Sequence, residues 1–344
     1  MMEQANHLET GAAEKLVETR HLSTWFPLKH SVVDYLFGKP KRHLKAVQDV
    51  SLDVYRGENL GLVGESGCGK STLAKTILRL YAPTSGQVLV RGKDISSLRG
   101  EALRRERPRM QMIFQDPYSS LNPRMSVYEI LEEMLTVHRM VEPGKVRERI
   151  GELLDMCGLS MDIAERFPGE FSGGQRQRIG IARALSLQPE LIIADEPVSA
   201  LDVSIQAQII NLLSNLQKSL GLTLLFISHD LRVVRHITHR VAVMYLGGIV
   251  ELGATEAVFR QPFHPYTSIL IKAAPVLDPT QRRTDYAITG EPPSPIDVPQ
   301  GCRFHPRCVH GKERCRRELP PLREVAPGRF AACHFPLPAA ATNA

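Results

Sequence analysis

Residues 60–71 read Leu60-Gly61-Leu62-Val63-Gly64-Glu65-Ser66-Gly67-Cys68-Gly69-Lys70-Ser71, an apolar run followed by a glycine-rich one. The apolar residues 60–63 predict a short buried strand, and helical periodicity follows over residues 71–80. The segment between them fits a phosphate-binding loop, which follows a strand and opens a helix. Its glycines let backbone N–H groups point inward around phosphates, and the start of the helix adds positive potential. We therefore expect a nucleotide to bind here.

Each side chain of this loop has its own expected role. Lys70 is expected to contact the β- and γ-phosphates of ATP, and Ser71 to ligate Mg²⁺, with Thr72 beside it. The other nucleotide-binding positions are expected to be Gly64, Ser66, Gly67 and Gly69.

An apolar run at residues 191–194 ends in two acids, Asp195 and Glu196. Asp195, at the end of a predicted strand, suits coordination of Mg²⁺ through water. Glu196 is expected to orient or deprotonate the attacking water, a task for a carboxylate near the γ-phosphate. An acidic pair after a strand could also cap a helix. After a phosphate loop it indicates nucleotide hydrolysis.

The rest of the chain alternates between strand and helix patterns. We expect an edge strand at residues 16–26, an inserted hairpin or loop at 27–45, helical segments at 127–159 and 204–220, and further strands at 46–55, 87–90, 110–114, 223–227 and 241–245. This alternation predicts an α/β fold with a largely parallel sheet covered by helices.

Composition limits the class of protein. The longest nearly apolar stretch, residues 241–250, is far shorter than the ~18 residues that span a bilayer. Residues 1–15 lack the apolar core of a signal peptide, so we expect a cytoplasmic chain that reaches membranes only through a partner. The net charge is +6, but the basic residues are scattered, so nucleic acid is not an expected partner.

Between the phosphate loop and the acidic pair, residues 171–176 read Phe-Ser-Gly-Gly-Gln-Arg. This segment resembles the signature of the ATP-binding cassette (ABC) ATPases, with phenylalanine in place of the usual leucine. The resemblance implies that Ser172, Gly174 and Gln175 contact an ATP molecule held by another subunit. The amides at the start of the following helix would form the anion site.

Further segments resemble ABC motifs in the order that the family requires. Gln115 follows a predicted strand and resembles the Q-loop glutamine, which can bond Mg²⁺ or water. Residues 199–202 resemble the D-loop, and His229 resembles the switch histidine that contacts the γ-phosphate. Family members usually stack an aromatic ring on adenine; Phe26 is the first choice here and Trp25 the alternative, although either ring could instead pack in the core.

The likeness extends to a narrower group. Residues 171–185 and 195–208, together with His264-Pro265-Tyr266, resemble the bacterial di- and oligopeptide importer ATPases, and within them the F-type subunit. This implies an ABC nucleotide-binding domain with a RecA-like parallel core, an antiparallel β subdomain and a helical subdomain at about 118–185. We expect a leader at 1–15, the ATPase domain at 16–260 and a C-terminal extension at 261–344.

Four of the six cysteines lie in the last 43 residues, at Cys302, Cys308, Cys315 and Cys333. Their spacing is wider than that of common structural zinc sites, and iron–sulfur clusters accept thiolates from varied loops. The resemblance implies a [4Fe-4S] cluster; zinc, or no metal, are the alternatives. His305, His310 and His334 lie close enough in sequence to replace a ligand.

The resemblance also implies the partners. These are a second, non-identical ATPase subunit that sandwiches ATP, two transmembrane permeases, and an extracytoplasmic peptide-binding protein. The chain would then be peripheral, on the cytoplasmic face of the inner membrane. Two alternatives stay open: import of nickel, glutathione or another small solute, and a soluble ABC ATPase that acts on nucleic acid.

Overall fold

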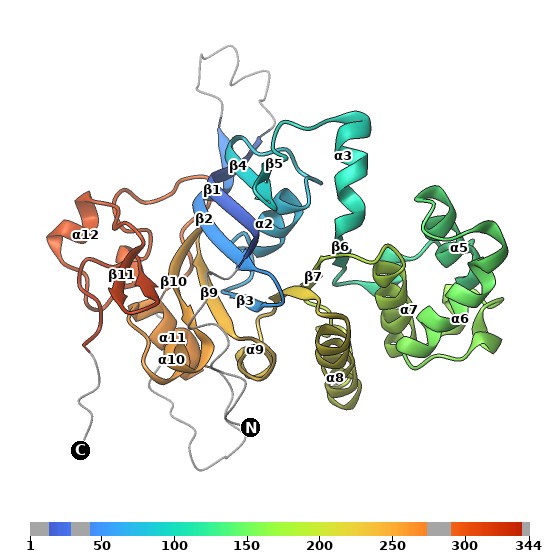
Figure 1. Ribbon diagram of the computed structural model, residues 1–344. Helices are drawn as coiled ribbons and strands as arrows, with labels where there is room; N and C mark the ends of the chain where they lie inside the picture. The colour runs from blue at the N-terminus through green and yellow to red at the C-terminus, as the bar shows by residue number, and fades with distance from the viewer. Residues whose placement is uncertain (1–13, 29–41, 274–289, 339–344) are drawn as a thin grey trace.

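The computed structural model describes residues 14–28, 42–273 and 290–338, which form two sheets and the helices that pack against them (Figure 1). The larger sheet has eight strands in the order β11 (Arg323–Ala326), β12 (Arg329–Ala331), β10 (Gly248–Ala254), β9 (Arg240–Tyr245), β3 (Asn59–Val63), β8 (Thr223–Ile227), β7 (Leu191–Asp195) and β6 (Met110–Ile113). Neighbouring strands from β9 to β6 are parallel, and the strands from β10 to β11 are added in antiparallel fashion. The prediction of a largely parallel α/β sheet is confirmed.

The smaller sheet is antiparallel and has the order β2 (His43–Tyr55), β1 (Lys15–Pro27), β4 (Ser85–Val90) and β5 (Lys93–Asp94). The prediction of an edge strand at residues 16–26 was wrong, because β1 pairs with β2 on one side and β4 on the other. Its two threonines are buried, and their hydroxyls are hydrogen-bonded within the fold. Thr19 Oγ1 donates to the Val50 carbonyl oxygen at 3.1 Å, and Thr24 Oγ1 lies 2.9 Å from Thr76 Oγ1.

The described helices follow the expected alternation. They are α2 (Lys70–Ile77), α3 (Gly100–Glu106), α4 (Pro117–Ser120), α5 (Val127–Val137), α6 (Val146–Met156), α7 (Gly173–Leu185), α8 (Val203–Leu220), α9 (Leu231–Ile237), α10 (Thr255–Arg260), α11 (Pro265–Ala273) and α12 (Glu313–Arg317). The single helical pattern expected over residues 127–159 is divided into α5 and α6, because Pro143 and Gly144 interrupt it. No helix in the described ranges is long and apolar enough to cross a bilayer.

The core forms on both faces of the larger sheet, as a sheet buried on both sides requires. In β8, Leu224 and Phe226 face the helices α5 to α9, whereas Leu225 and Ile227 face α2 and the smaller sheet. The two clusters of buried side chains therefore meet across the strands that carry the phosphate loop and the acidic pair.

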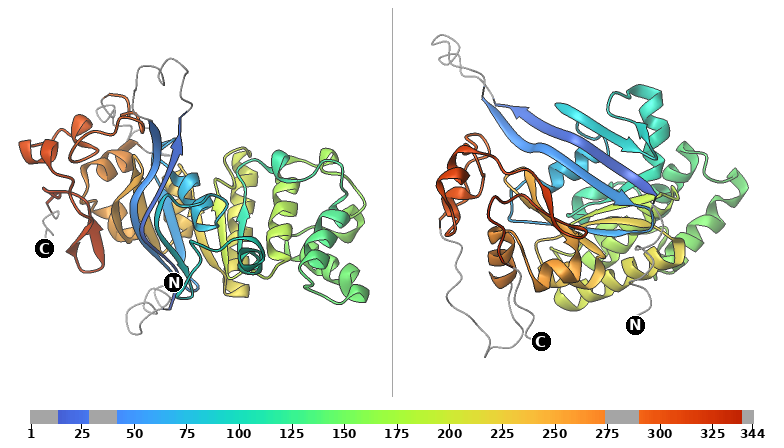
Figure 2. Two further views of the ribbon diagram at one scale, coloured as in Figure 1. Left: turned by 90° about the horizontal axis from the view of Figure 1, so that it is seen from above. Right: turned by 60° about the vertical axis from the view of Figure 1, so that its left-hand side comes forward.

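The C-terminal segment and the helices α5, α6 and α7 lie at opposite ends of the molecule (Figures 1 and 2). The strand β12 pairs with β10, so the predicted extension continues the sheet of the ATPase core. The predicted leader lies almost wholly outside the described residues, and so does most of the predicted insertion at 27–45. The proposed division at residue 260 stays a prediction.

Candidate active site

The loop between β3 and α2 has the backbone that its glycines predict. Gly69, which precedes α2, has a φ of 111°, and a Cβ atom placed on it would lie 2.2 Å from the carbonyl oxygen of Ala46. Glycine is therefore required here both by conformation and by space. The loop can consequently pass close beneath β2.

The ammonium group of Lys70 lies inside the loop. Lys70 Nζ donates to the carbonyl oxygens of Gly64 at 2.8 Å and Glu65 at 3.0 Å, and the residue is 5% exposed. These bonds hold the charge next to the amides of the loop, where phosphate oxygens would bind.

The two expected magnesium ligands meet at the start of α2. Ser71 Oγ donates to Asp195 Oδ1 at 2.9 Å, across the edge of the sheet where β7 ends. Burial raises the pKa of Asp195, while the Ser71 hydroxyl opposes that shift. Oxygen donors of this kind suit Mg²⁺, so this donor set fits the ion.

Two further predicted residues, Gln115 and His229, approach the same carboxylate oxygen of a third, Glu196. Glu196 Oε2 accepts a hydrogen bond from Gln115 Nε2 at 3.1 Å and lies 3.2 Å from His229 Nδ1. These residues follow β6, β7 and β8, whose carboxyl ends lie at one edge of the sheet. The Glu196 side chain is 16% exposed, whereas that of His229 is 60% exposed, so the histidine forms the open side of the group.

An open cleft joins these groups. It is lined by Leu44, Ala46, Ser66, Gly67, Gly69, Lys70, Ser71, Thr72, Gln115, Glu196 and Pro295. Most of the predicted nucleotide-binding residues are therefore brought together on one surface.

Phe26 is not among the residues that line this cleft. Its ring packs edge-on against Tyr81, with ring centroids 5.2 Å apart, and Trp25 lies near His43 and Lys45. The adenine-stacking role of Phe26 gains no support from this arrangement. The side chains of Leu44 and Pro295 occupy the cleft wall instead; the sequence carries no signal for Pro295, which approaches from the distant tail.

The signature segment lies outside this cleft. Ser172 precedes α7, where its hydroxyl accepts from the Gln175 amide at 3.3 Å and Gln175 Oε1 accepts from the Ser172 amide at 3.0 Å. This capping box leaves both residues exposed at the positive end of a thirteen-residue helix. The surface is suited to an anion that this chain's own loop does not hold.

The four C-terminal cysteines line one cavity, together with His305, His310 and His334. The four cysteines are free thiols, and burial raises the pKa of Cys302 to about 11. In the described ranges no group of three or more His, Cys, Asp or Glu side chains is arranged to hold a metal ion. The chemistry of four thiols fits a thiolate-ligated metal or cluster, although the side chains are not arranged as a metal site.

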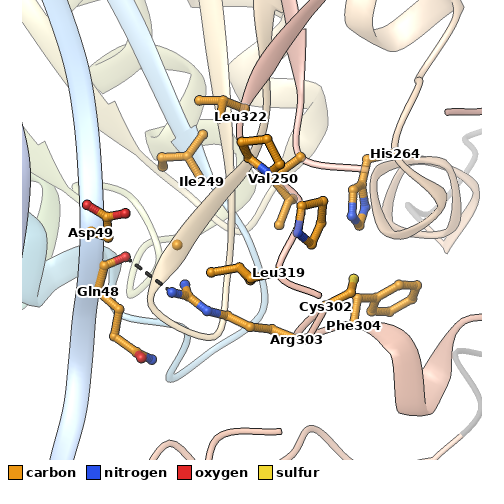
Figure 3. A pocket seen from close by; sticks show the side chains of 14 residues that line it. Gln48, Asp49, Ile249, Val250, His264, Cys302, Arg303, Phe304, Leu319 and Leu322 are labelled. Atoms are coloured by element: carbon orange, nitrogen blue, oxygen red, sulfur yellow. Dashed lines mark hydrogen bonds between the residues drawn. The ribbon is translucent and has the colours of Figure 1, made fainter. Parts of the chain in front are cut away.

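A second pocket adjoins this cavity, between β2, β10 and the C-terminal segment (Figure 3). Cys302, Phe304 and His264 line it on one side. Arg303 reaches across it and donates to the Gln48 carbonyl oxygen at 3.3 Å. The C-terminal segment is thus bonded to the smaller sheet as well as to the larger one.

Comparison with known sequences agrees with the site. Residues 47–199 match the family described as ABC transporter, and residues 250–315 match the oligopeptide/dipeptide transporter C-terminal region. A probable peptide ABC transporter ATP-binding protein, y4tS of Sinorhizobium fredii, is 57% identical over 300 residues, which cover 87% of this chain and 85% of that one. The oligopeptide transport ATP-binding protein AppF of Bacillus subtilis is 51% identical over 325 residues, covering 94% and 98%.

Solved structures give the same result for the cassette. The dimeric ATP-binding cassette MJ0796, bound to ADP and phosphate, superposes with a TM-score of 0.61 at 28% identity, over 70% of this chain and 98% of that one. The cbiO1 protein of Clostridium perfringens gives a TM-score of 0.60 at 27% identity, over 72% and 91%. The chain thus has the fold of known ATP-binding cassettes, and it belongs to the ABC transporter family, as an ATP-binding cassette ATPase that carries the oligopeptide/dipeptide transporter C-terminal region.

Proposed function

We propose that this chain is the ATP-hydrolysing subunit of a membrane importer for dipeptides and oligopeptides. The observation that carries the proposal is the pair of relatives at 57% and 51% identity, whose names state peptide transport, combined with the C-terminal match at residues 250–315. The chain would act on the cytoplasmic face of the cell membrane. Its peptide would be selected by an extracytoplasmic binding protein and the permeases.

The proposed chemistry at this chain's own cleft uses the residues that meet there. Lys70 and the loop amides would hold the β- and γ-phosphates, and Ser71, Asp195 and Gln115 are the residues that would hold Mg²⁺. The ion would neutralise charge on the phosphates. Glu196, oriented by Gln115 and His229, accepts the proton of the attacking water, while His229 stabilises the γ-phosphate as the terminal bond breaks.

A second, similar ATPase subunit would pair with this chain to enclose the bound ATP. The start of α7, with Ser172, Gly174 and Gln175, would bind the γ-phosphate of the nucleotide that the partner holds. Support comes from Ser172 and Gln175, which are both exposed at the start of α7 and do not line the cleft of this chain's own loop.

A groove between β6 and α5 suits the transmembrane permeases. It is lined by apolar side chains, among them Phe114, Met125, Met134 and Val137, and is flanked by Arg104 and Arg107. Val137 is 54% exposed. We propose that a helix from a permease packs here, so that closure of the two ATPase subunits moves the permeases.

We further propose that Cys302, Cys308, Cys315 and Cys333 hold a [4Fe-4S] cluster, with Zn²⁺ as the alternative. Support comes from the common cavity that the four thiols line. A bound cluster would supply one-electron chemistry or a structural cross-link. Anaerobic purification followed by an absorbance spectrum and assays of iron, sulfide and zinc distinguishes the cluster from zinc, and protein free of all three would refute both.

The test of function is the substitution Glu196→Gln in the assembled complex. ATP hydrolysis should fall by at least about 100-fold, because a general base contributes that much or more. Nucleotide binding should be retained, because the phosphate loop is intact. Unchanged turnover would reject the assignment of Glu196.

The transported solute is tested by measuring ATP turnover in the complex with its binding protein. Peptides should stimulate turnover, and stimulation by nickel or glutathione alone would reject peptides as the transported solute.

A further inference from the structure

The C-terminal segment contacts the phosphate-binding loop directly. Arg307 ends the short 3-10 helix η7 (His305–Arg307), between two of the clustered cysteines. Its guanidinium donates to Glu65 Oε2 at 2.9 Å and to Glu65 Oε1 at 3.1 Å. The Arg307 side chain is 5% exposed and that of Glu65 is 20% exposed. A mostly buried ion pair with two hydrogen bonds orients the Glu65 carboxylate and also balances its charge.

Tyr266 provides a second contact with the same loop residue. Its phenolic oxygen accepts a hydrogen bond from the Glu65 amide at 2.8 Å. The ring is fully buried and packs against Tyr245 and Phe304, at centroid distances of 4.7 Å and 5.5 Å. The side chain and the amide of Glu65 are therefore both held by residues beyond position 261.

Glu65 is the second residue of the loop, so its position affects the whole phosphate site. Lys70 Nζ bonds the carbonyl oxygen of Glu65, which links the contact to the charge that would face the phosphates. A carboxylate within a loop that binds anions is also electrostatically unfavourable for ATP. Arg307 offsets that charge, because its guanidinium pairs with both carboxylate oxygens.

We propose that Arg307 and Tyr266 are positioning residues for ATP. They hold Glu65 in place, and Arg307 neutralises its charge, so that the loop binds the triphosphate. The proposal rests on the assignment of residues 64–71 to ATP binding. It gives the His-Pro-Tyr segment and the turn between Cys302 and Cys308 a role in the ATPase reaction itself.

The turn that carries Arg307 also carries a cavity cysteine. The Arg307 amide donates to the Phe304 carbonyl oxygen at 3.0 Å, and the Cys308 amide donates to that of His305 at 3.2 Å. Since Arg307 and Cys308 share this hydrogen-bonded turn, the guanidinium is positioned by the same backbone that places a thiol in the cysteine cavity.

A matched control exists in the same segment. Arg329, on β12, forms a buried ion pair with Glu251 on β10 at 3.0 Å. This pair also joins the C-terminal segment to the cassette, but its partner lies on a strand and not on the phosphate loop. A variant of Arg329 therefore measures the effect of loosening the segment without removing a group that is bonded directly to Glu65.

The experiment compares Arg307→Gln, Glu65→Gln/Arg307→Gln and Arg329→Gln in the full chain, with MgATP binding measured by calorimetry and KM and kcat measured in the complex. Arg307→Gln should raise the Kd and KM for ATP about tenfold or more, since small misplacements of a binding loop have effects of this size. The double variant should recover most of the affinity, because the unpaired carboxylate is gone. Arg329→Gln should lower the melting temperature with the Kd unchanged.

Two results would overturn the proposal: wild-type affinity in Arg307→Gln, or an equal loss in Arg329→Gln. If Arg307→Gln does not fold, Arg307→Lys and the double variant decide by the same criterion. Lys70→Ala serves as the separate test of the loop, since retained ATP binding in that variant would reject residues 64–71 as the nucleotide site.

Discussion

Glu196 shows how a single residue is placed by its backbone. Its φ of 48° lies in the left-handed region, which is uncommon for residues with a side chain. The amide of Glu196 donates to the Ile227 carbonyl oxygen at 3.0 Å, which holds this conformation against the end of β8. This left-handed conformation turns the Glu196 carboxylate toward Gln115 and His229 and away from the strand direction. A strained residue at this position is consistent with a carboxylate whose direction matters.

His264 gives a pH-dependent prediction at the residue scale. Burial lowers its pKa from the ordinary value of 6.5 to about 3, and its Nδ1 accepts from the Tyr266 amide at 3.1 Å. The nearby charges are Glu251, which accepts from the amides of Phe263 and His264, and Arg329, which pairs with Glu251. The unfolded chain binds a proton below pH 6.5 and the folded chain does not, so stability is full above that pH and falls as the pH decreases toward 3.

Between pH 7.5 and 5, this difference should remove about 2 kcal/mol from the free energy of unfolding. The variant His264→Asn keeps a side-chain acceptor at this position and removes the titration. Urea unfolding at several pH values should therefore show a shallower acid slope for the variant than for the wild-type chain. Equal slopes would mean that His264 takes up a proton in the folded chain at the same pH as in the unfolded chain.

At the scale of elements, the strands that are buried on both faces are the ones that the sequence predicts best. Strands β7, β8 and β9 lie inside the sheet and are buried on both faces, so each reads as a continuous apolar run and was predicted almost to its bounds. β1 was assigned to an edge because its buried threonines resemble exposed polar residues, although their hydroxyls bond within the fold. Leu44 and Pro295 reach the cleft through tertiary contacts that local patterns do not encode.

The start of α5 gives a prediction about one element. Ser126 accepts from the Glu129 amide at 3.2 Å, and Glu129 Oε2 accepts from the Ser126 amide at 2.6 Å. Ser126→Ala should reduce the free energy of unfolding by about 1 kcal/mol, because an amide of the first turn loses its acceptor. The exposed Ser204→Ala, in the first turn of α8, should stay within about 0.5 kcal/mol of wild type in the same denaturant titration. An equal effect of the two substitutions would reject the capping role.

At the scale of the whole molecule, the C-terminal segment is part of the ATPase fold. Arg307 and Glu65 are separated by 242 residues and Arg329 and Glu251 by 78, yet both pairs are in contact. The sequence predicted a C-terminal extension at residues 261–344 with four clustered cysteines. The structure shows that this extension lies against three parts of the cassette: the phosphate loop, β10 and β2. Such contacts depend on the final packing, which explains why sequence motifs indicated the residues that meet at the cleft but not this connection.

Removing the segment should therefore destabilise the cassette itself. A chain that ends at residue 289 loses Phe304 from the aromatic cluster around Tyr245 and Tyr266, and leaves the buried carboxylate of Glu251 without Arg329. Loss of a buried phenylalanine costs about 3–5 kcal/mol, and an unpaired buried charge costs about as much. Their sum approaches the whole stability of a typical domain, about 5–15 kcal/mol, so the shortened chain should be largely unfolded or insoluble.

The matched control keeps the contacts between the described residues and removes the covalent connection. A protease site inserted between residues 274 and 289 allows the purified chain to be cut, and the two pieces should stay together, because the strand pairing and ion pairs do not depend on the cut bond. Thermal unfolding and size-exclusion chromatography compare the intact, cut and shortened chains. A shortened chain that is soluble and melts at the temperature of the intact one would show that the C-terminal segment is an independent appendage. The pairing of β10 with β12 would then contribute nothing to the stability of the cassette.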